Sequence, residues 1–148
     1  MPINWDPDLN TGIVIIDQQH MRIVEYINQL EEANGRRDID AIGAVLDSCI
    51  DYTKSHFAFE ENLQEAAGYK YCRPHKRVHD LFIRRINEYK KRFDKGEDVA
   101  GELHELLARW LITHIKQDDA DYVEAVKRNR GDTVINEKGW LKRFFKSS

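Results

Sequence analysis

The spacing of apolar residues between glycine and proline positions restricts the fold of this chain most strongly. Apolar side chains recur at intervals of three and four, as in Ile16, Ile23, Ile27 and Leu30, and this is the period of a helix with one buried face. Glycine and proline fall near the predicted joints, with Gly43 as the one interior exception. Because no alternating strand pattern or internal repeat is present, the sequence predicts an all-α protein.

Four segments of helical length lie between these joints. They span about 17–34, 38–66, 74–95 and 98–130. Short joints place consecutive helices antiparallel, so we expect an antiparallel up-down-up-down four-helix bundle, with Asp17 and Asp38 capping the first two helices. A chain of 148 residues can bury one sizeable core. We therefore predict one bundle domain with an N-terminal arm over residues 1–130, and a short C-terminal tail over residues 131–148.

Composition argues against several kinds of partner and location. With 23 basic and 26 acidic residues and a net charge of −3, the chain has no basic field for nucleic acid. No uncharged apolar run approaches the roughly 18 residues of a membrane span, and no signal peptide is apparent, so we expect a cytoplasmic protein. Two cysteines do not imply a disulfide framework in a chain of this length. Cys49 is predicted to be a core residue and Cys72 a loop thiol.

Polar residues occupy core positions on all four predicted helices. Five of the six histidines and one carboxylate lie on the apolar stripes: His20, His56, Glu60, His75, His79 and His114. A buried unpaired carboxylate costs several kcal/mol, and a buried polar group without a hydrogen bond costs about 1–3 kcal/mol. Since a bound metal ion is the economical way to offset these costs, the pattern predicts a metal site.

The spacing and topology of these residues agree with one shared site. His56 and Glu60 are four residues apart, as are His75 and His79, so each pair projects from one helix face. In an antiparallel bundle the start of the first helix, the end of the second and the start of the third lie at one end. His114 reaches that end only if the last helix extends beyond the bundle, and we therefore predict that extension.

Taken singly, each of these histidines has a plainer interpretation. A histidine on an apolar face is more often a hydrogen-bonded core residue than a metal ligand, so the metal interpretation depends on the combination of paired residues at one bundle end. His104 provides the contrast, because it lies ten residues before His114 and points about 80° away from it. We predict that His104 is a surface residue outside the site.

In chain order, these residues resemble the ligand set of the hemerythrin family. The matching elements are His20, the HxxxE of His56 to Glu60, the HxxxH of His75 to His79 and the HxxxxD of His114 to Asp119. The similarity extends from the Trp5 region, through Thr11–Gly12 and the segment from Asp17 to His20, to about Lys127. The resemblance implies that His75, His79 and His114 bind one iron, that His20 and His56 bind the other, and that Glu60, Asp119 and an oxo or hydroxo group bridge them.

The resemblance also implies a function, which is reversible binding of dioxygen. Dioxygen would bind end-on at the open position of the five-coordinate iron, taking one electron from each iron, so the protein would be an oxygen carrier or store and not an enzyme. The residues favour the same reading, because five neutral imidazoles and only two carboxylates make high-valent iron less accessible. Bulky apolar residues one turn from the ligands form the predicted oxygen pocket: Ile23, Val24, Phe59, Leu63, Trp110 and Leu111.

Two other functions remain open at this point. One is an oxygen or redox sensor that signals through a protein partner, and the other is a di-iron oxidase or peroxide scavenger. The tail from Lys138 to Lys146 is basic and aromatic. It is predicted to pack on the bundle, to contact a protein partner or an anionic membrane surface, or to be disordered.

The distance from His114 to Asp119 conflicts with a regular α-helix. Five residues turn about 500°, so Asp119 stands roughly 140° from His114, whereas Asp118 would share its face. Following the family spacing, we predict that Asp119 is the ligand and that the helix widens locally into a π-like turn.

Overall fold

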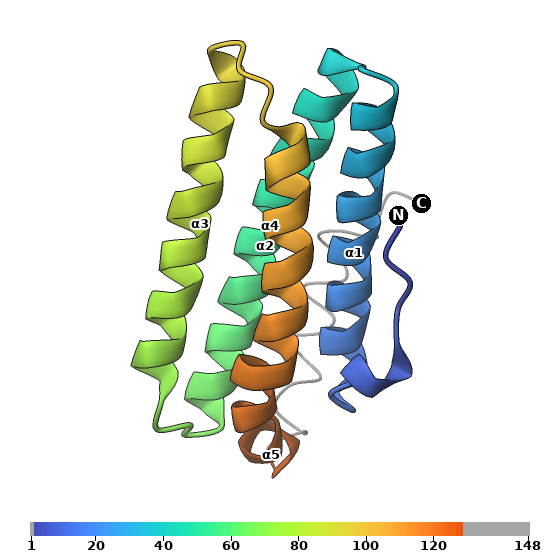
Figure 1. Cartoon of the computed structure of the whole chain (residues 1–148). Helices are drawn as coiled ribbons and strands as arrows, with labels where there is room; N and C mark the ends of the chain where they lie inside the picture. The colour runs from blue at the N-terminus through green and yellow to red at the C-terminus, as the bar shows by residue number, and fades with distance from the viewer. Residues whose placement is uncertain (1, 129–148) are drawn as a thin grey trace, which may run out of the picture.

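The computed structural model describes residues 2–128, without the side chains of residues 118, 120, 121 and 128. Four long helices form the bundle in Figure 1: α1 (Val14–Gly35), α2 (Ile39–Ala66), α3 (Cys72–Asp94) and α4 (Ala100–Thr113). A short 3-10 helix, η1 (Pro7–Leu9), precedes them, and a π-helical turn, η2 (His114–Asp119), leads into α5 (Ala120–Arg128). No strand occurs within residues 2–128. The predicted all-α four-helix bundle is confirmed, while the predicted tail lies outside the described residues.

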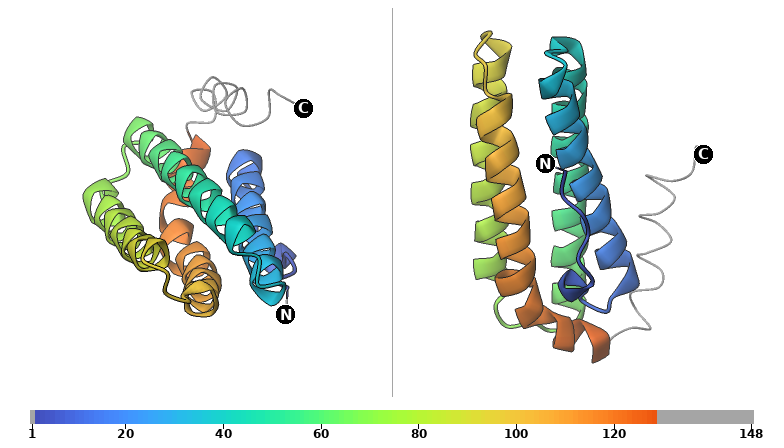
Figure 2. Two further views of the ribbon diagram at one scale, coloured as in Figure 1. Left: turned by 90° about the horizontal axis from the view of Figure 1, so that it is seen from above. Right: turned by 45° about the vertical axis from the view of Figure 1, so that its right-hand side comes forward.

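The helices run up, down, up and down, and each packs against its neighbours in sequence (Figures 1 and 2). Helix α1 packs on α2 and α4, and α2 packs on α3. Helices α3 and α4 meet through the stacked rings of Phe82 and Trp110, whose centroids are 3.6 Å apart. The start of α1, the end of α2, the start of α3 and the end of α4 therefore lie together. We call this the polar end of the bundle and the opposite one the apolar end.

The N-terminal arm lies along α1 and turns sharply into it. The side chain of Asn28 binds the backbone of Ile3 twice, through Oδ1 at 2.7 Å and Nδ2 at 2.9 Å. Asp17 does not cap α1 as predicted, because the helix begins three residues earlier. Its carboxylate instead accepts hydrogen bonds from the N–H and hydroxyl of Thr11 and from the N–H of Gly12. Gly12 has a φ of +87°, which favours glycine, and the turn fixes the start of α1.

The last helix differs from the single straight segment predicted over 98–130. Regular α-helix begins at Ala100 and ends at Thr113, where the π turn η2 follows. A π turn changes the direction of the chain, and α5 crosses the polar end of the bundle, as the right-hand view of Figure 2 shows. Helix α5 packs against α2 there. The helical chain thus continues past His114 as expected, but it covers the end of the bundle instead of projecting beyond it.

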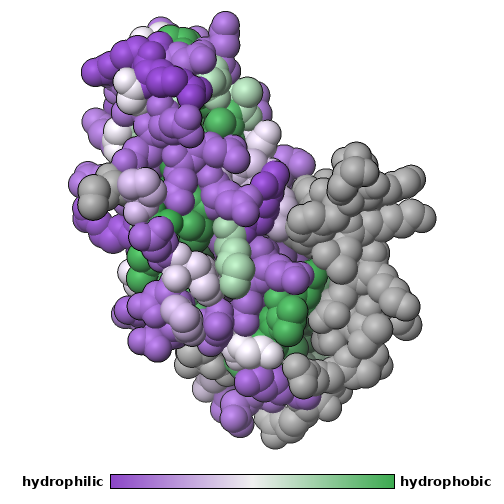
Figure 3. Space-filling view, turned by 90° about the vertical axis from the view of Figure 1, so that its right-hand side faces the viewer, coloured by the Kyte–Doolittle hydropathy of each residue, from purple (hydrophilic) through white to green (hydrophobic). Residues whose placement is uncertain are grey.

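The face shown in Figure 3 is mostly hydrophilic, and three of the most exposed large apolar residues, Val14, Ile39 and Leu81, lie on three different helices. Within residues 2–128, none of the helices combines the length and the apolar character that a membrane crossing requires. The cytoplasmic location expected from the sequence stays a prediction.

Candidate metal centre

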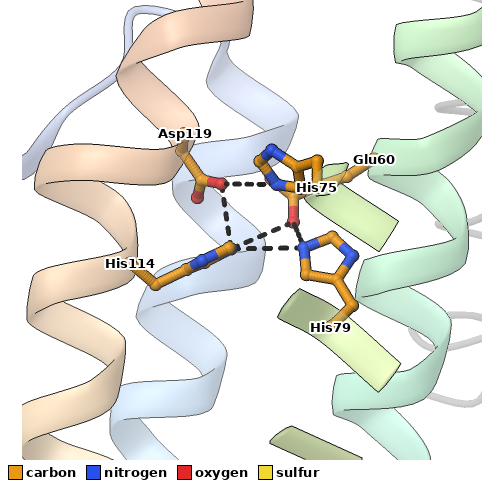
Figure 4. Close-up of side chains that lie close together, drawn as sticks. All are labelled: Glu60, His75, His79, His114 and Asp119. Carbon is orange, nitrogen blue, oxygen red and sulfur yellow. Dashed lines mark hydrogen bonds and ion pairs between the residues drawn. The ribbon is translucent and has the colours of Figure 1, made fainter. Parts of the chain in front are cut away.

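The seven side chains singled out by the sequence meet inside the polar end. They come from α1 (His20), α2 (His56, Glu60), α3 (His75, His79) and η2 (His114, Asp119). The most exposed of them, His75, shows only 6% of its surface, and each of the others shows 1% or less. Figure 4 shows five of these side chains pointing toward one another.

The seven residues form two overlapping groups, each able to surround one ion. One group contains Glu60, His75, His79, His114 and Asp119, and the other contains His20, His56, Glu60 and Asp119. Within each group the candidate ligand atoms all lie within 4.8 Å of one another. The groups share their two carboxylates, so the arrangement is that of a pair of adjacent ions with two residues in common.

Asp119 spans the two groups through its two oxygens. Its Oδ1 lies 2.9 Å from Nε2 of His114 and 3.4 Å from Nε2 of His75. Its Oδ2 lies 3.0 Å from Nε2 of His20, in the other group. Each carboxylate oxygen therefore faces a different metal position.

Glu60 is held between the same two positions. Its Oε1 lies 3.0 Å from Nε2 of His56 and 3.5 Å from Nε2 of His79, which belong to different groups. Its other oxygen accepts a hydrogen bond from the hydroxyl of Tyr122, a residue of α5. The covering helix thus orients the carboxylate at the centre of the site.

The π turn explains how Asp119 reaches the site. Helix η2 spans the six residues from His114 to Asp119, and a π turn pairs residues five apart. The wider turn brings these two side chains to one side, so the predicted π-like turn is confirmed. The side chain of Asp118 lies outside the described part of the chain.

Several ligand candidates have buried polar atoms without a hydrogen-bond partner. These atoms are Nε2 of His20, His56 and His75, Oε1 of Glu60, and both carboxylate oxygens of Asp119. Buried polar atoms are rarely left without a partner, and all of these atoms belong to residues of the two metal groups. The donor set of imidazole nitrogens and carboxylate oxygens suits a first-row transition metal such as iron. The residues present therefore fit a metal pair.

The charge states of the carboxyl groups also suit metal binding. Burial acts to raise the pKa of Glu60, but the imidazoles of His56 and His114 outweigh burial and hold that pKa well below its ordinary value. Burial and the charge of Glu60 likewise act to raise the pKa of Asp119, but His114 and His20 lower it. Both groups are ionised at neutral pH.

Two partners of the histidines were not identified from the sequence. Oε1 of Gln19 lies 2.5 Å from Nδ1 of His56, and Oε2 of Glu61 lies 2.9 Å from Nδ1 of His79. An amide oxygen and a carboxylate oxygen can only accept hydrogen bonds, so Nδ1 of each histidine carries the hydrogen. Nε2 of each ring then directs its lone pair toward the site. Burial lowers the pKa of His56, although the neighbouring Glu60 acts to raise it.

Aromatic rings pack against the histidines on the side facing α3 and α4. The ring of Phe57 stacks on His79, with centroids 3.8 Å apart and an interplanar angle of 4°. Trp110 stacks on His114 at 4.5 Å. Of the predicted oxygen pocket, Trp110 is half-buried. The remaining members, Ile23, Val24, Phe59, Leu63 and Leu111, are buried in the core. Phe57 was not predicted, although its place next to His56 was a usable signal.

His104 lies outside the site and Cys49 lies in the core, as predicted. His104 pairs with Glu31, with 3.0 Å between Nε2 and Oε2, and belongs to neither metal group in the described part of the chain. Cys49 is buried, and burial raises the pKa of its thiol to about 11, so the thiolate needed for redox chemistry is scarce at neutral pH. Cys72 is the first residue of α3 and not a loop residue, and its thiol donates to the carbonyl of Tyr69.

Comparison with known proteins agrees with this geometry. Residues 11–126 match the Hemerythrin HHE cation binding domain. The chain is 54% identical over 144 residues to the bacteriohemerythrin of Pseudomonas aeruginosa (strain UCBPP-PA14), covering 96% of this chain and 94% of that protein. It is 30% identical over 122 residues to myohemerythrin-1 of Phascolopsis gouldii, covering 82% and 92%.

A solved structure agrees as well. A crystal structure of a hemerythrin variant superimposes with a TM-score of 0.81 at 27% identity, covering 85% of this chain and 98% of that one. The buried cluster of histidine, glutamate and aspartate residues fits the di-iron centre of this fold. The chain belongs to the hemerythrin family.

Proposed function

We propose that this chain binds dioxygen reversibly at a di-iron centre and acts as an oxygen carrier or store. One iron would be held by His75, His79 and His114, the other by His20 and His56, and both would be contacted by Glu60 and Asp119. The main support for the proposal is that the two metal groups differ in size. One contains five candidate ligand residues and the other contains four. The iron with fewer protein ligands has room for a small molecule.

The ligand types support binding over turnover. When bound at this site, two ferrous ions would supply the two electrons that dioxygen takes up on binding and gives back on release. Five neutral imidazoles and two shared carboxylates put little negative charge on the metal pair, which disfavours the higher oxidation states that oxygen-splitting enzymes use. This charge balance supports a carrier or store.

The surroundings of the site exclude water and hold the carboxylates in place. Phe57 and Trp110 cover the histidines with apolar ring faces, and a dry site slows the loss of electrons to solvent-assisted oxidation. Burial and the neighbouring Glu60 raise the pKa of Tyr122 well above its ordinary value. Tyr122 therefore keeps its hydrogen and donates it to Oε2 of Glu60, and Oε1 of that carboxylate would remain for a bound metal.

Optical spectra of the iron-loaded protein test the proposal. The protein is reduced without oxygen, exposed to air, and then returned to argon, with a spectrum recorded at each step. We expect a colourless reduced form, a visible band in air, and loss of that band under argon. Immediate conversion to a stable ferric form, or turnover of a reductant with peroxide above a free-iron control, would contradict the proposal and favour an enzyme.

One contact gives specific support to a sensor function as the second candidate. The hydrogen bond from Tyr122 links α5 directly to Glu60, so a change at the centre can alter how α5 packs on the polar end. Amide hydrogen exchange of residues 122–127 in the reduced and oxygenated forms separates the two functions. A large difference in exchange favours a sensor, and equal exchange favours a carrier or store.

A further inference from the structure

We propose that Glu61 is a positioning residue of the metal centre, whose negative charge strengthens His79 as a ligand and lowers the reduction potential of the iron. The inference rests on the proposed di-iron function and concerns a residue outside the seven ligand candidates. Glu61 belongs to α2 and follows Glu60 directly, but its side chain contacts Nδ1 of His79 and is not one of the candidate metal ligands. Its carboxylate reaches across to α3.

The contact between Glu61 and His79 is short, and His79 is almost fully buried. Oε2 of Glu61 lies 2.9 Å from Nδ1 of His79, and His79 is 1% exposed. The carboxylate accepts the hydrogen of Nδ1, and this fixes the tautomer. The opposite nitrogen, Nε2, then presents its lone pair to the site, 3.5 Å from Oε1 of Glu60. A histidine that donates to a carboxylate is a more basic ligand than one that donates to a neutral group.

The other metal position supplies a comparison within the same molecule. Nδ1 of His56 is held in the same way, 2.5 Å from an oxygen, but that oxygen belongs to the neutral amide of Gln19. The two bonds fix the same tautomer and differ in charge. Charge-assisted hydrogen bonds are roughly twice as strong as neutral ones. The charge of Glu61 therefore makes His79 the more basic of the two ligands.

Glu61 lies where the buried site meets solvent. Its side chain is 22% exposed and lines a groove of about 310 Å³ between α2 and α3, which also contains Lys54, Lys76 and His79. Nζ of Lys76 lies 4.0 Å from Oε1 of Glu61 and only 3.1 Å from Oδ1 of Asp80. Lys76 is thus paired mainly with Asp80, and His79 is the nearer of the two polar partners of Glu61 within residues 2–128.

A simple surface ion pair does not explain this arrangement. Exposed ion pairs contribute little to stability, and the separation of 4.0 Å from Lys76 is too long for a hydrogen bond. The bond to His79 is within hydrogen-bond range and joins a buried ring. Glu61 therefore acts on the metal centre through His79.

Three variants test the role of the charge. Glu61→Gln keeps an oxygen acceptor and removes the charge, Glu65→Gln removes the same charge from an exposed residue one turn further along α2, and Gln19→Glu adds a charge beside His56. Each variant and the wild type are loaded with iron, and the midpoint potential is measured by spectroelectrochemical titration. We expect a higher potential for Glu61→Gln, a lower one for Gln19→Glu, and little change for Glu65→Gln.

Metal affinity provides a second readout that does not depend on oxygen binding. Competition of cobalt(II) with a chelator is expected to give a dissociation constant about tenfold weaker for Glu61→Gln, the lower end of the effect of removing such a partner. Equal potentials and equal affinities for Glu61→Gln and Glu65→Gln would overturn the inference. A loss of melting temperature without a change in potential would also overturn it, because it would indicate a structural role.

The role of Glu61 and the proposed function can be tested independently of each other. If the wild type fails to bind oxygen reversibly but Glu61→Gln still shifts the potential relative to Glu65→Gln, the function is wrong and the role of Glu61 stands. If the wild type binds and releases oxygen while these two variants have equal potentials, the function stands and the role of Glu61 is wrong.

Discussion

The two ends of the bundle are built from the same four helices and stabilised in different ways. At the apolar end, Leu30, Leu46 and Leu103 fill the core and are each 1% exposed. A Cβ on Gly43 would meet the ring of Phe93 at 3.2 Å, so this interior glycine lets α2 and α3 approach closely. At the polar end the equivalent core positions hold imidazoles and carboxylates. The same helix geometry thus supports either an apolar core or a metal centre, depending on which residues occupy the buried stripe.

His104 and His114 show the same contrast between the two ends of the bundle, because they lie on one continuous helical segment. His104 lies on α4 toward the apolar end, is partly exposed and pairs with Glu31. His114 begins η2, is 1% exposed and faces Glu60 and Asp119. The orientation around the helix, and not the residue type, decides whether a histidine becomes a ligand candidate.

The largest expected effect comes from removing a residue shared by both metal groups. Glu60→Ala removes a candidate ligand from each group, so iron loading should fall from two ions per chain to less than one, as measured by metal analysis. His104→Ala is the matched control at the other end and should keep two ions. Equal loading of Glu60→Ala and the wild type would show that the polar end is not the metal centre.

A substitution in the apolar end should affect stability without affecting metal. Leu46→Ala removes a side chain that is 1% exposed, and truncation of a buried leucine costs about 2–5 kcal/mol. Denaturant unfolding measures this loss, and metal analysis should still find two irons in the folded protein. Loss of iron in this variant would mean that the two ends do not behave independently.

Acid should destabilise the metal-free protein through the polar end. The folded pKa of His56 lies below the ordinary value of 6.5, so the unfolded chain takes up the proton first as the pH falls. The contribution of His56 to the free energy of unfolding is therefore fully present above pH 6.5 and is lost as the pH falls below that value. The lowered pKa values of Glu60 and Asp119 add a second loss below their ordinary values of 4.5 and 3.8. A melting temperature that rises between pH 7 and pH 5 would contradict this expectation.

The smallest effect is expected at the contact between His104 and Glu31. Both side chains are partly exposed, at 19% and 31%, and such ion pairs contribute about 0–1 kcal/mol. His104→Gln should change the free energy of unfolding by less than about 1 kcal/mol and leave the optical spectrum unchanged. A changed spectrum would connect the apolar end to the metal centre.

Much of the fold and of the site geometry could be predicted because the decisive signals are local. The period of apolar residues identified the four helices, and the four-residue spacing of His56 with Glu60 and of His75 with His79 identified faces that converge. The family spacing from His114 to Asp119, which a regular α-helix does not accommodate, predicted the π turn that the structure contains. Each of these signals lies within a few turns of one helix.

The features that could not be predicted depend on how separate helices rotate against one another. Gln19 and His56 are 37 positions apart, and Tyr122 and Glu60 are 62 positions apart. The bend after Thr113 brings α5 across the polar end. No residue pattern within α5 indicates the direction in which it runs. The start of α1 at Val14 was also not predicted. Asp17 is a residue type that commonly caps a helix, but its carboxylate binds the turn before the helix instead.

Anomalous diffraction at the iron edge, from crystals of the iron-loaded protein, tests the assignment of the metal centre most directly. We expect two peaks inside the polar end, with the two shared carboxylates touching both. The histidines should divide between the peaks as His75, His79 and His114 on one side, and His20 and His56 on the other. A single peak, or peaks away from these side chains, would contradict the assignment.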